Sequence, residues 1–182
     1  MHAELLDSPD KLDRFQREAQ ALNCLSHPFI LSTYAFGVTA DWQPYLVLPF
    51  LEGKSLQDAI ESESPIGIKR CMAILLMICD ALSHVHQEGI VHRDLKPGNI
   101  MLVSDESGNE IAQIVDFGIS KPLSTSKIDA QKLTSTGEIF GSPFYMSPEQ
   151  WRGLPVDTRS DIYSFGCLMY ETLTGEVPLD AE

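Results

Sequence analysis

The stretch that decides the fold of this 182-residue chain is His92-Arg93-Asp94-Leu95-Lys96-Pro97-Gly98-Asn99. It lies between two short apolar segments, residues 90–91 and 100–103, which are typical of small strands bracketing a loop. Two motifs follow it in order: Asp116-Phe117-Gly118, directly after the apolar segment 111–115, and then Ser147-Pro148-Glu149. A lone Asp-Phe-Gly would carry little weight, whereas the complete loop followed by both motifs is a specific pattern.

Helical periodicity surrounds this stretch. Apolar residues recur at spacings of three and four within residues 12–25, 68–86 and 158–174, which predicts three amphipathic helices, the last ended by Gly175. Ser55 with Asp58 three residues later predicts the cap of a short helix. We expect strands at residues 29–36 and 45–50, and a loop over the polar stretch 122–138.

Composition excludes several classes of protein. A net charge of −13 argues against a nucleic-acid or anionic-membrane surface; it fits either a self-repelling soluble surface or one that favours basic protein substrates. The longest apolar run, residues 71–79, is far shorter than the ~20 residues that span a bilayer, so we expect no membrane segment in this chain. Its four cysteines show neither zinc-site nor redox spacing, and we expect buried thiols. They are Cys24, Cys71, Cys79 and Cys167.

The three motifs resemble those of the eukaryotic-type serine/threonine protein kinase family, and the wording around Ser147-Pro148-Glu149-Gln150 is similar to its bacterial members. The resemblance covers essentially the whole chain. It implies an α+β, partial protein-kinase-like bilobal fold, mostly the helical large lobe with a remnant of the small-lobe sheet. We expect a small-lobe remnant in residues 1–48, an inter-lobe linker in 49–51 and an incomplete large lobe in 52–182.

The resemblance implies transfer of the γ-phosphoryl group of ATP to Ser or Thr hydroxyls of protein substrates. Asp94 would accept the proton of the substrate hydroxyl or orient that hydroxyl, and Lys96 would counter the charge on the transferring phosphate. Asn99 and Asp116 would supply oxygen ligands to Mg²⁺, a hard cation that prefers them. The structural alternative is that Asp94 and Asn99 only form the loop. Asp161 matches a buried aspartate that holds the backbone of this loop.

Further residues follow from the same resemblance. Leu48 would be the gatekeeper of the ATP site, the carbonyl of Pro49 and the N–H of Leu51 would face adenine, and Met101 would form its floor. Arg93 would receive a phosphate on the activation loop, with Thr136 and Thr134 as acceptors. The docking segment for peptide substrates would run from Gly141 to Glu149.

Two parts of the family pattern are absent from the sequence. The chain has no G-x-G-x-x-G loop and no lysine strand resembling V-A-I-K, so Glu18, which resembles the helix carboxylate that pairs with that lysine, lacks its partner. Glu149 would be a buried carboxylate whose arginine partner is also missing. We therefore expect Met1 to be an internal methionine of a longer chain, and this fragment alone to be inactive.

Two other functions remain open. One is a non-catalytic pseudokinase-like interaction module, which the intact Asp94, Lys96, Asn99 and Asp116 disfavour. The other is a small-molecule phosphotransferase, which the docking segment disfavours. The use of ATP and the reduced thiols lead us to expect a cytoplasmic location.

Overall fold

In a computed structural model of the chain, residues 25–40, 43–63, 65–116 and 143–178 are described, and all structural statements concern them. The strands are β1 Ala35–Val38, β2 Pro44–Val47, β3 Gly53–Ser55, β4 Ile100–Ser104 and β5 Glu110–Ile114. The helices are α2 Leu56–Glu63, α3 Ile68–Gln87, α5 Pro148–Trp151 and α6 Thr158–Thr174, with 3₁₀ turns at Pro97–Asn99 and Pro143–Tyr145. Separate groups of strands and helices confirm the predicted α+β class.

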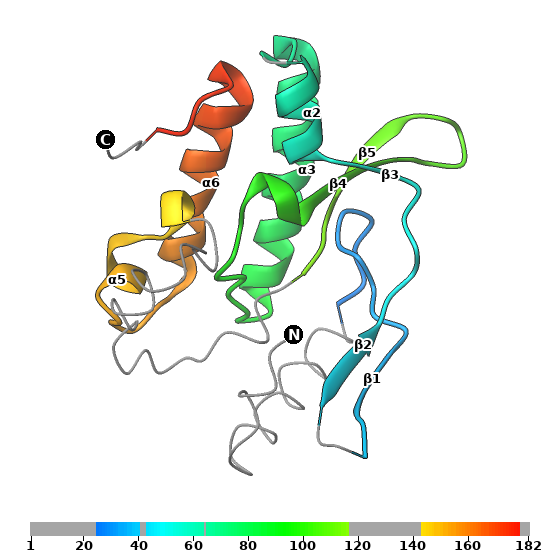
Figure 1. Cartoon of the computed structure of the whole chain (residues 1–182), viewed down its shortest axis with the longest axis vertical. Coiled ribbons are helices and arrows are strands. Elements are labelled where there is room, and N and C mark those ends of the chain that lie inside the picture. The colour runs from blue at the N-terminus through cyan, green and yellow to red at the C-terminus, as the bar shows by residue number, and fades with distance from the viewer. Residues whose placement is uncertain (1–24, 41–42, 64, 117–142, 179–182) are drawn as a thin grey trace.

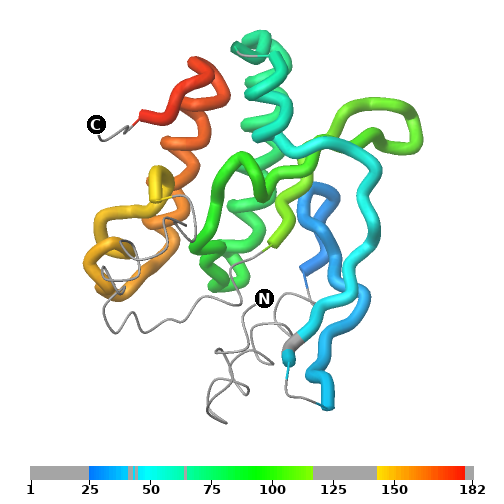
Figure 2. The backbone as a smooth tube through the Cα atoms, in the orientation of Figure 1, coloured from blue at the N-terminus to red at the C-terminus, as the bar shows by residue number. Residues whose placement is uncertain are grey.

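The strands form two antiparallel sheets. β1 pairs with β2, and β3, β4 and β5 form a three-stranded sheet in that order. An extended segment, residues 48–52, carries the chain from the first sheet to the second (Figure 2). The predicted linker, residues 49–51, lies within this segment, and the division into lobes remains a prediction.

Helix α3 is the centre of the described fold. It packs against β5 and α6, and Figure 1 shows α3 and α6 side by side with the β1–β2 hairpin apart from them. Its buried residues recur every three or four positions, which is the spacing of one helical face. The fully buried side chains of the core include Leu56, Ile74, Ile78, Val85, Leu95, Ile100, Ile114 and Leu168.

Local sequence signals account for the ends of the helices. At the start of α2, Ser55 Oγ accepts a hydrogen bond from the Asp58 N–H (3.0 Å) and the Asp58 carboxylate accepts one from the Ser55 N–H (3.1 Å). This reciprocal cap confirms the prediction. α6 ends at Gly175, whose φ of 81° is the left-handed conformation that glycine adopts at low cost.

The predicted strand at residues 29–36 is wrong over residues 29–34. The Ile30 N–H donates to the His27 carbonyl (3.1 Å) in a turn, while Phe29 and Leu31 exchange backbone hydrogen bonds with Ile114 of β5. The strand proper begins at Ala35. Ile30 forms a single parallel bridge with Ile114 of β5, so the local preference of these apolar residues does not produce a continuous strand here.

The prediction of buried thiols holds for Cys71 and Cys167 but is wrong for Cys79, which is exposed on α3. Cys24 lies outside the described residues.

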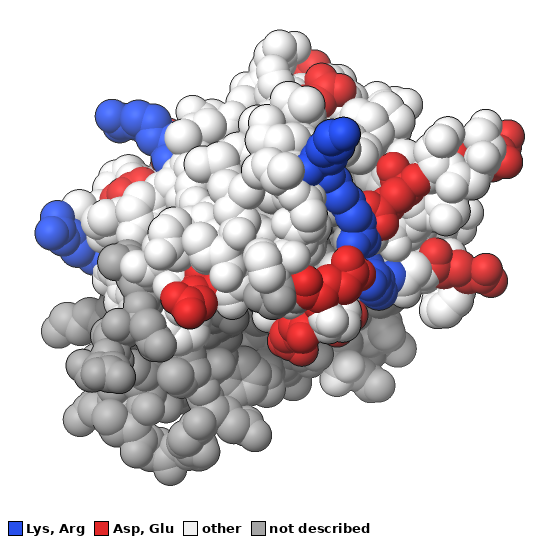
Figure 3. Space-filling view, turned by 90° about the horizontal axis from the view of Figure 1, so that it is seen from above, with Lys and Arg blue, Asp and Glu red and all other residues white. Residues whose placement is uncertain are grey.

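No helix in the described part of the chain has the length and apolar character needed to cross a bilayer. On the face shown in Figure 3, the central lysine and arginine side chains lie against acidic ones.

Candidate active site

Buried Asp161 of α6 holds the backbone of the loop that carries Asp94. Its side chain is fully buried, and its carboxylate oxygens accept hydrogen bonds from the N–H groups of His92 (2.8 Å) and Arg93 (2.9 Å). His86 Nε2, from the last turn of α3, lies 2.8 Å from the same carboxylate. A buried carboxylate needs several such partners. The architectural role predicted for Asp161 is confirmed.

Two residues of the candidate site have unusual backbone conformations. Arg93 has a φ of 66° and Asp116 a φ of 57°, and no other described non-glycine residue has a positive φ. Such conformations are costly for residues with a Cβ and persist where surrounding contacts fix them. Both lie at motif positions that the sequence singles out.

The three predicted catalytic residues lie together. Lys96 Nζ is 3.4 Å from Asp94 Oδ2, and Asn99 Nδ2 donates to the Asp94 carbonyl (2.8 Å) and to Asp94 Oδ2 (3.2 Å). The side chains of Asp94 and Lys96 are partly exposed, whereas Asn99 is buried in the turn before β4. The arrangement presents a carboxylate and a cation side by side at a partly open surface.

The donor set at the base of the hairpin β4–β5 fits Mg²⁺. Because Asn99 uses its amide nitrogen toward Asp94, its side-chain oxygen is the end left to bind a cation. The Val115 N–H donates to the Asn99 carbonyl (2.9 Å), which brings the next residue, Asp116, to the same end of the hairpin. One carboxylate and one amide oxygen, completed by substrate phosphates and water, are the ligands that Mg²⁺ takes in proteins.

The residues predicted to contact adenine lie on two segments. Leu48, Pro49 and Leu51 are on the connection between β2 and β3, and Leu48 is 40% exposed. Met101 is half-buried on β4, opposite Ser55 of β3. Their assignment to an adenine site remains a prediction. Glu18, Thr134 and Thr136 lie outside the described residues.

The described part of the predicted docking segment, residues 143–149, is attached to α6. The Tyr145 hydroxyl donates to buried Glu171, and Ser164 Oγ donates to the Tyr145 carbonyl (2.7 Å). Burial raises the pKa of Glu171, while the hydrogen bond from Tyr145 opposes this rise. The segment is therefore fixed to the same helix that supplies Asp161.

The expectation of a buried, unpartnered Glu149 is wrong. Its side chain is only partly buried, and it accepts a hydrogen bond from Ser160 Oγ of α6. That hydrogen bond lowers the pKa of Glu149. A carboxylate that keeps solvent and gains a hydroxyl donor avoids the penalty of a buried charge.

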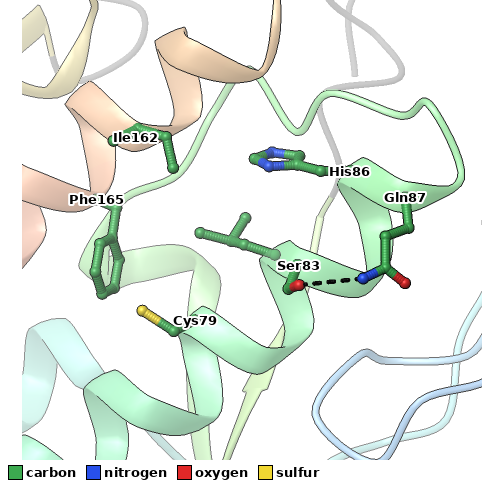
Figure 4. A pocket seen from close by; sticks show the side chains of 7 residues that line it. Cys79, Ser83, His86, Gln87, Ile162 and Phe165 are labelled. Atoms are coloured by element: carbon green, nitrogen blue, oxygen red, sulfur yellow. Dashed lines mark hydrogen bonds between the residues drawn. The ribbon is translucent and has the colours of Figure 1, made fainter.

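A groove of about 420 Å³ separates α3 from α6 on the surface. Figure 4 shows Cys79, Ser83, His86 and Gln87 on its α3 side and Ile162 and Phe165 on its α6 side. Its lining includes none of the residues predicted to act on ATP, Mg²⁺ or substrate.

Two residues at the site were missed by sequence reasoning, His86 and Gln150. Gln150 Nε2 donates to the Arg93 carbonyl (2.8 Å), across 57 positions of sequence. The spacing Ser147-x-x-Gln150 could have signalled a helix cap, but not this second bond. For His86 the only available signal was its place in the last turn of a helix.

Comparisons with known proteins agree with this geometry. The protein kinase domain family matches residues 3–182, so the chain belongs to the protein kinase family. It is 40% identical over 185 residues to serine/threonine-protein kinase PknB of Mycobacterium tuberculosis (strain ATCC 25618 / H37Rv), covering 100% of this chain and 28% of the relative. It is 37% identical over 178 residues to serine/threonine-protein kinase pkn3 of Myxococcus xanthus, covering 98% of this chain and 32% of that protein.

Solved structures share the fold. The kinase domain of Mycobacterium tuberculosis PknI matches with a TM-score of 0.76 at 25% identity, over 99% of this chain and 64% of that one. Rad53 1–466 in complex with AMP-PNP matches with a TM-score of 0.73 at 29% identity, over 96% of this chain and 41% of that one. The chain thus spans under a third of the length of the two curated relatives above. The matches to solved structures confirm the predicted kinase fold.

Proposed function

We propose that this protein transfers the γ-phosphoryl group of ATP to serine or threonine hydroxyls of other proteins. The observation that carries the proposal is the cluster of Asp94, Lys96 and Asn99, joined by contacts of 2.8–3.4 Å on a loop whose backbone is tied to buried Asp161. Such transfer depends on positioning and charge neutralisation more than on covalent chemistry by the protein.

The reaction assigns a task to each residue. The Asp94 carboxylate orients the attacking hydroxyl and receives its proton as the new O–P bond forms. The bond between the γ-phosphorus and the bridging oxygen breaks, and ADP leaves with that oxygen. Lys96, 3.4 Å from Asp94, offers its positive charge to the transferring group.

Asn99 and Asp116 are the proposed Mg²⁺ ligands, and the bound ion would neutralise charge on the phosphates. Leu48, Pro49, Leu51 and Met101 are the proposed adenine contacts. The Rad53 relative, described in complex with AMP-PNP, is consistent with a nucleotide site in this fold.

Regulation is proposed on the same grounds. Arg93 precedes Asp94 and would bind a phosphate on Thr136 or Thr134, while Glu18 would pair with a phosphate-binding lysine. The expected location is the cytoplasm, where ATP is available. The double substitution of Thr134 and Thr136 by alanine should lower activity and remove phosphate from that segment. Unchanged activity would contradict this part of the proposal.

The test is phosphotransfer by the complete gene product, with Mg²⁺, ATP and a generic protein substrate. Asp94→Asn should lower kcat at least a hundredfold, about 10²–10⁴ for a lost general base. Asp157→Asn is the matched control, because Asp157 is the exposed N-cap of α6 and asparagine caps equally well. Equal rates for wild type and Asp94→Asn, or transfer only to small molecules, would contradict the proposal; no transfer at all would favour a pseudokinase-like module.

A further inference from the structure

The side chain of Gln150 joins two segments that are far apart in sequence. On one side, its Oε1 accepts hydrogen bonds from the Ser147 N–H (3.0 Å) and from Ser147 Oγ (3.2 Å), which completes the cap of α5. On the other side, its Nε2 donates to the Arg93 carbonyl (2.8 Å). We call this set of hydrogen bonds the Gln150 bridge.

The chemistry of the two partners fixes the orientation of the amide. The Ser147 N–H needs an acceptor, and the Arg93 carbonyl needs a donor. A primary amide carries an acceptor oxygen and a donor nitrogen on one planar group. A glutamate at the same position would keep the acceptor, and with it the helix cap, but would lose the donor. Glutamine is therefore more specific here than capping alone requires.

The carbonyl that the bridge contacts belongs to the peptide group directly before Asp94. The nitrogen of that same peptide donates to His92 Nδ1 (3.2 Å), and the preceding N–H, that of Arg93, donates to Asp161 (2.9 Å). Arg93 has a φ of 66°, a conformation that external contacts must stabilise. Gln150 thus supplies a hydrogen bond on the carbonyl side of a strained residue.

We propose that Gln150 is a positioning residue: through the Arg93 carbonyl it fixes the orientation of the Asp94 peptide and couples it to the docking segment. The bridge connects residues 143–149, which precede Gln150, to the catalytic loop. Displacement of either segment would stretch the hydrogen bond to Arg93. This inference rests on the proposed kinase function, because positioning matters only where Asp94 acts on a substrate.

The test compares Gln150→Glu with Gln150→Met in the complete gene product. Gln150→Glu keeps the cap and removes the donor, so kcat should fall about tenfold near neutral pH, with KM for ATP changed less than about twofold. When the new carboxyl is protonated, its O–H can donate to the Arg93 carbonyl. The activity of this variant relative to wild type should therefore rise as the pH is lowered from about 8 to about 6, whereas Gln150→Met, which cannot donate, should show no recovery.

Gln87→Glu is the matched control. It makes the same amide-to-acid change on exposed Gln87 of α3, whose amide donates a 3.5 Å hydrogen bond to Ser83 of the same helix, and should leave kcat unchanged.

Amide hydrogen exchange of residues 92–94 gives a readout independent of activity: exchange should accelerate in Gln150→Met and, near pH 8, in Gln150→Glu. Wild-type kcat and wild-type exchange in Gln150→Glu would overturn the inference, as would equal losses in both variants without recovery at low pH. A wild-type protein without phosphotransfer would contradict the proposed function instead. In that case amide exchange alone decides the inference. Faster exchange of residues 92–94 in the Gln150 variants would support it, and unchanged exchange would overturn it.

Discussion

His86 Nε2, in the last turn of α3, lies 2.8 Å from Oδ2 of fully buried Asp161 on α6. The same oxygen accepts the His92 N–H, so a single carboxylate links two helices and the catalytic loop. Because a buried carboxylate that loses a partner keeps its desolvation cost, His86→Ala should lower the free energy of unfolding by about 1–3 kcal/mol. Urea denaturation measures this. Ser83→Ala, an exposed change on the same helix, should shift the free energy of unfolding by less than about 0.5 kcal/mol.

The pair of Tyr145 and Glu171 should make stability depend on pH. Burial raises the pKa of Glu171 above its ordinary value of 4.5. The folded chain therefore holds this proton more tightly than the unfolded chain. The contribution of Glu171 to stability is fully present below pH 4.5 and is lost as the pH rises through the raised, folded-state pKa. Glu171→Gln should flatten this part of the stability curve, measured by thermal melts at a series of pH values.

Tyr145→Phe should steepen the dependence of stability on pH, the opposite of the effect of Glu171→Gln. The tyrosine hydroxyl stabilises the ionised Glu171, so its removal raises the pKa of Glu171 further. Stability should fall by about 1.5–3 kcal/mol at neutral pH, and the loss should extend to higher pH. Tyr170→Phe removes a hydroxyl from a residue that is 45% exposed, so it should change neither the stability at neutral pH nor its dependence on pH. Superimposable pH curves for wild type and Tyr145→Phe would show that the buried hydrogen bond contributes nothing.

Arg70 should stabilise the fold in a salt-dependent way. It contacts Glu110 of β5 through two hydrogen bonds, of 2.8 and 2.7 Å, and also pairs with Glu63 of α2. Salt screens partly exposed pairs. Arg70→Ala should therefore lower Tm by about 1–3 °C at low ionic strength, and by less in 1 M salt. Arg159, whose partner Asp157 is two residues away, is the control; a matching loss in Arg159→Ala would argue against a specific network.

Two glycines, one inside α6 and one at its C-terminal cap, should respond oppositely to alanine. Gly175 has a φ of 81°, which strains any residue with a Cβ, so Gly175→Ala should lower the free energy of unfolding by about 1 kcal/mol. At Gly166, inside the helix, an added Cβ meets no heavy atom of the described residues within 4 Å, apart from its chain neighbours and the backbone of its own helix. Gly166→Ala should therefore raise the free energy of unfolding by about 0.5–1 kcal/mol. Two changes of the same sign would contradict the pair of predictions.

Local signals predicted the features that depend on neighbouring residues. The cap of Ser55 and Asp58, the periodicity of α3 and the terminal Gly175 all involve residues within a few positions of one another. The family motifs added the cluster of Asp94, Lys96 and Asn99, which the fold brings within contact. These contacts are also short-range, because one loop carries all three side chains.

Features set by distant parts of the chain were not predictable in this way. Residues 29–31 pair with Ile114 of β5 because the tertiary fold brings them together, not because of their own propensity. Gln150 and Arg93 are 57 positions apart, and His86 and Asp161 are 75. The exposure of Cys79 follows from what packs beside α3, which periodicity alone does not specify.

In the β4–β5 hairpin, the proposed metal ligands and the turn lie at opposite ends. Ile100 pairs with Ile114 at one end, beside Asn99 and Asp116, and Ser104 pairs with Glu110 at the other. At that far end, Asp105 closes the turn by accepting hydrogen bonds from Ser107 and Asn109. Because the strand register fixes the proposed metal ligands independently of the turn, the turn is a suitable place to insert a peptide tag or a reporter group.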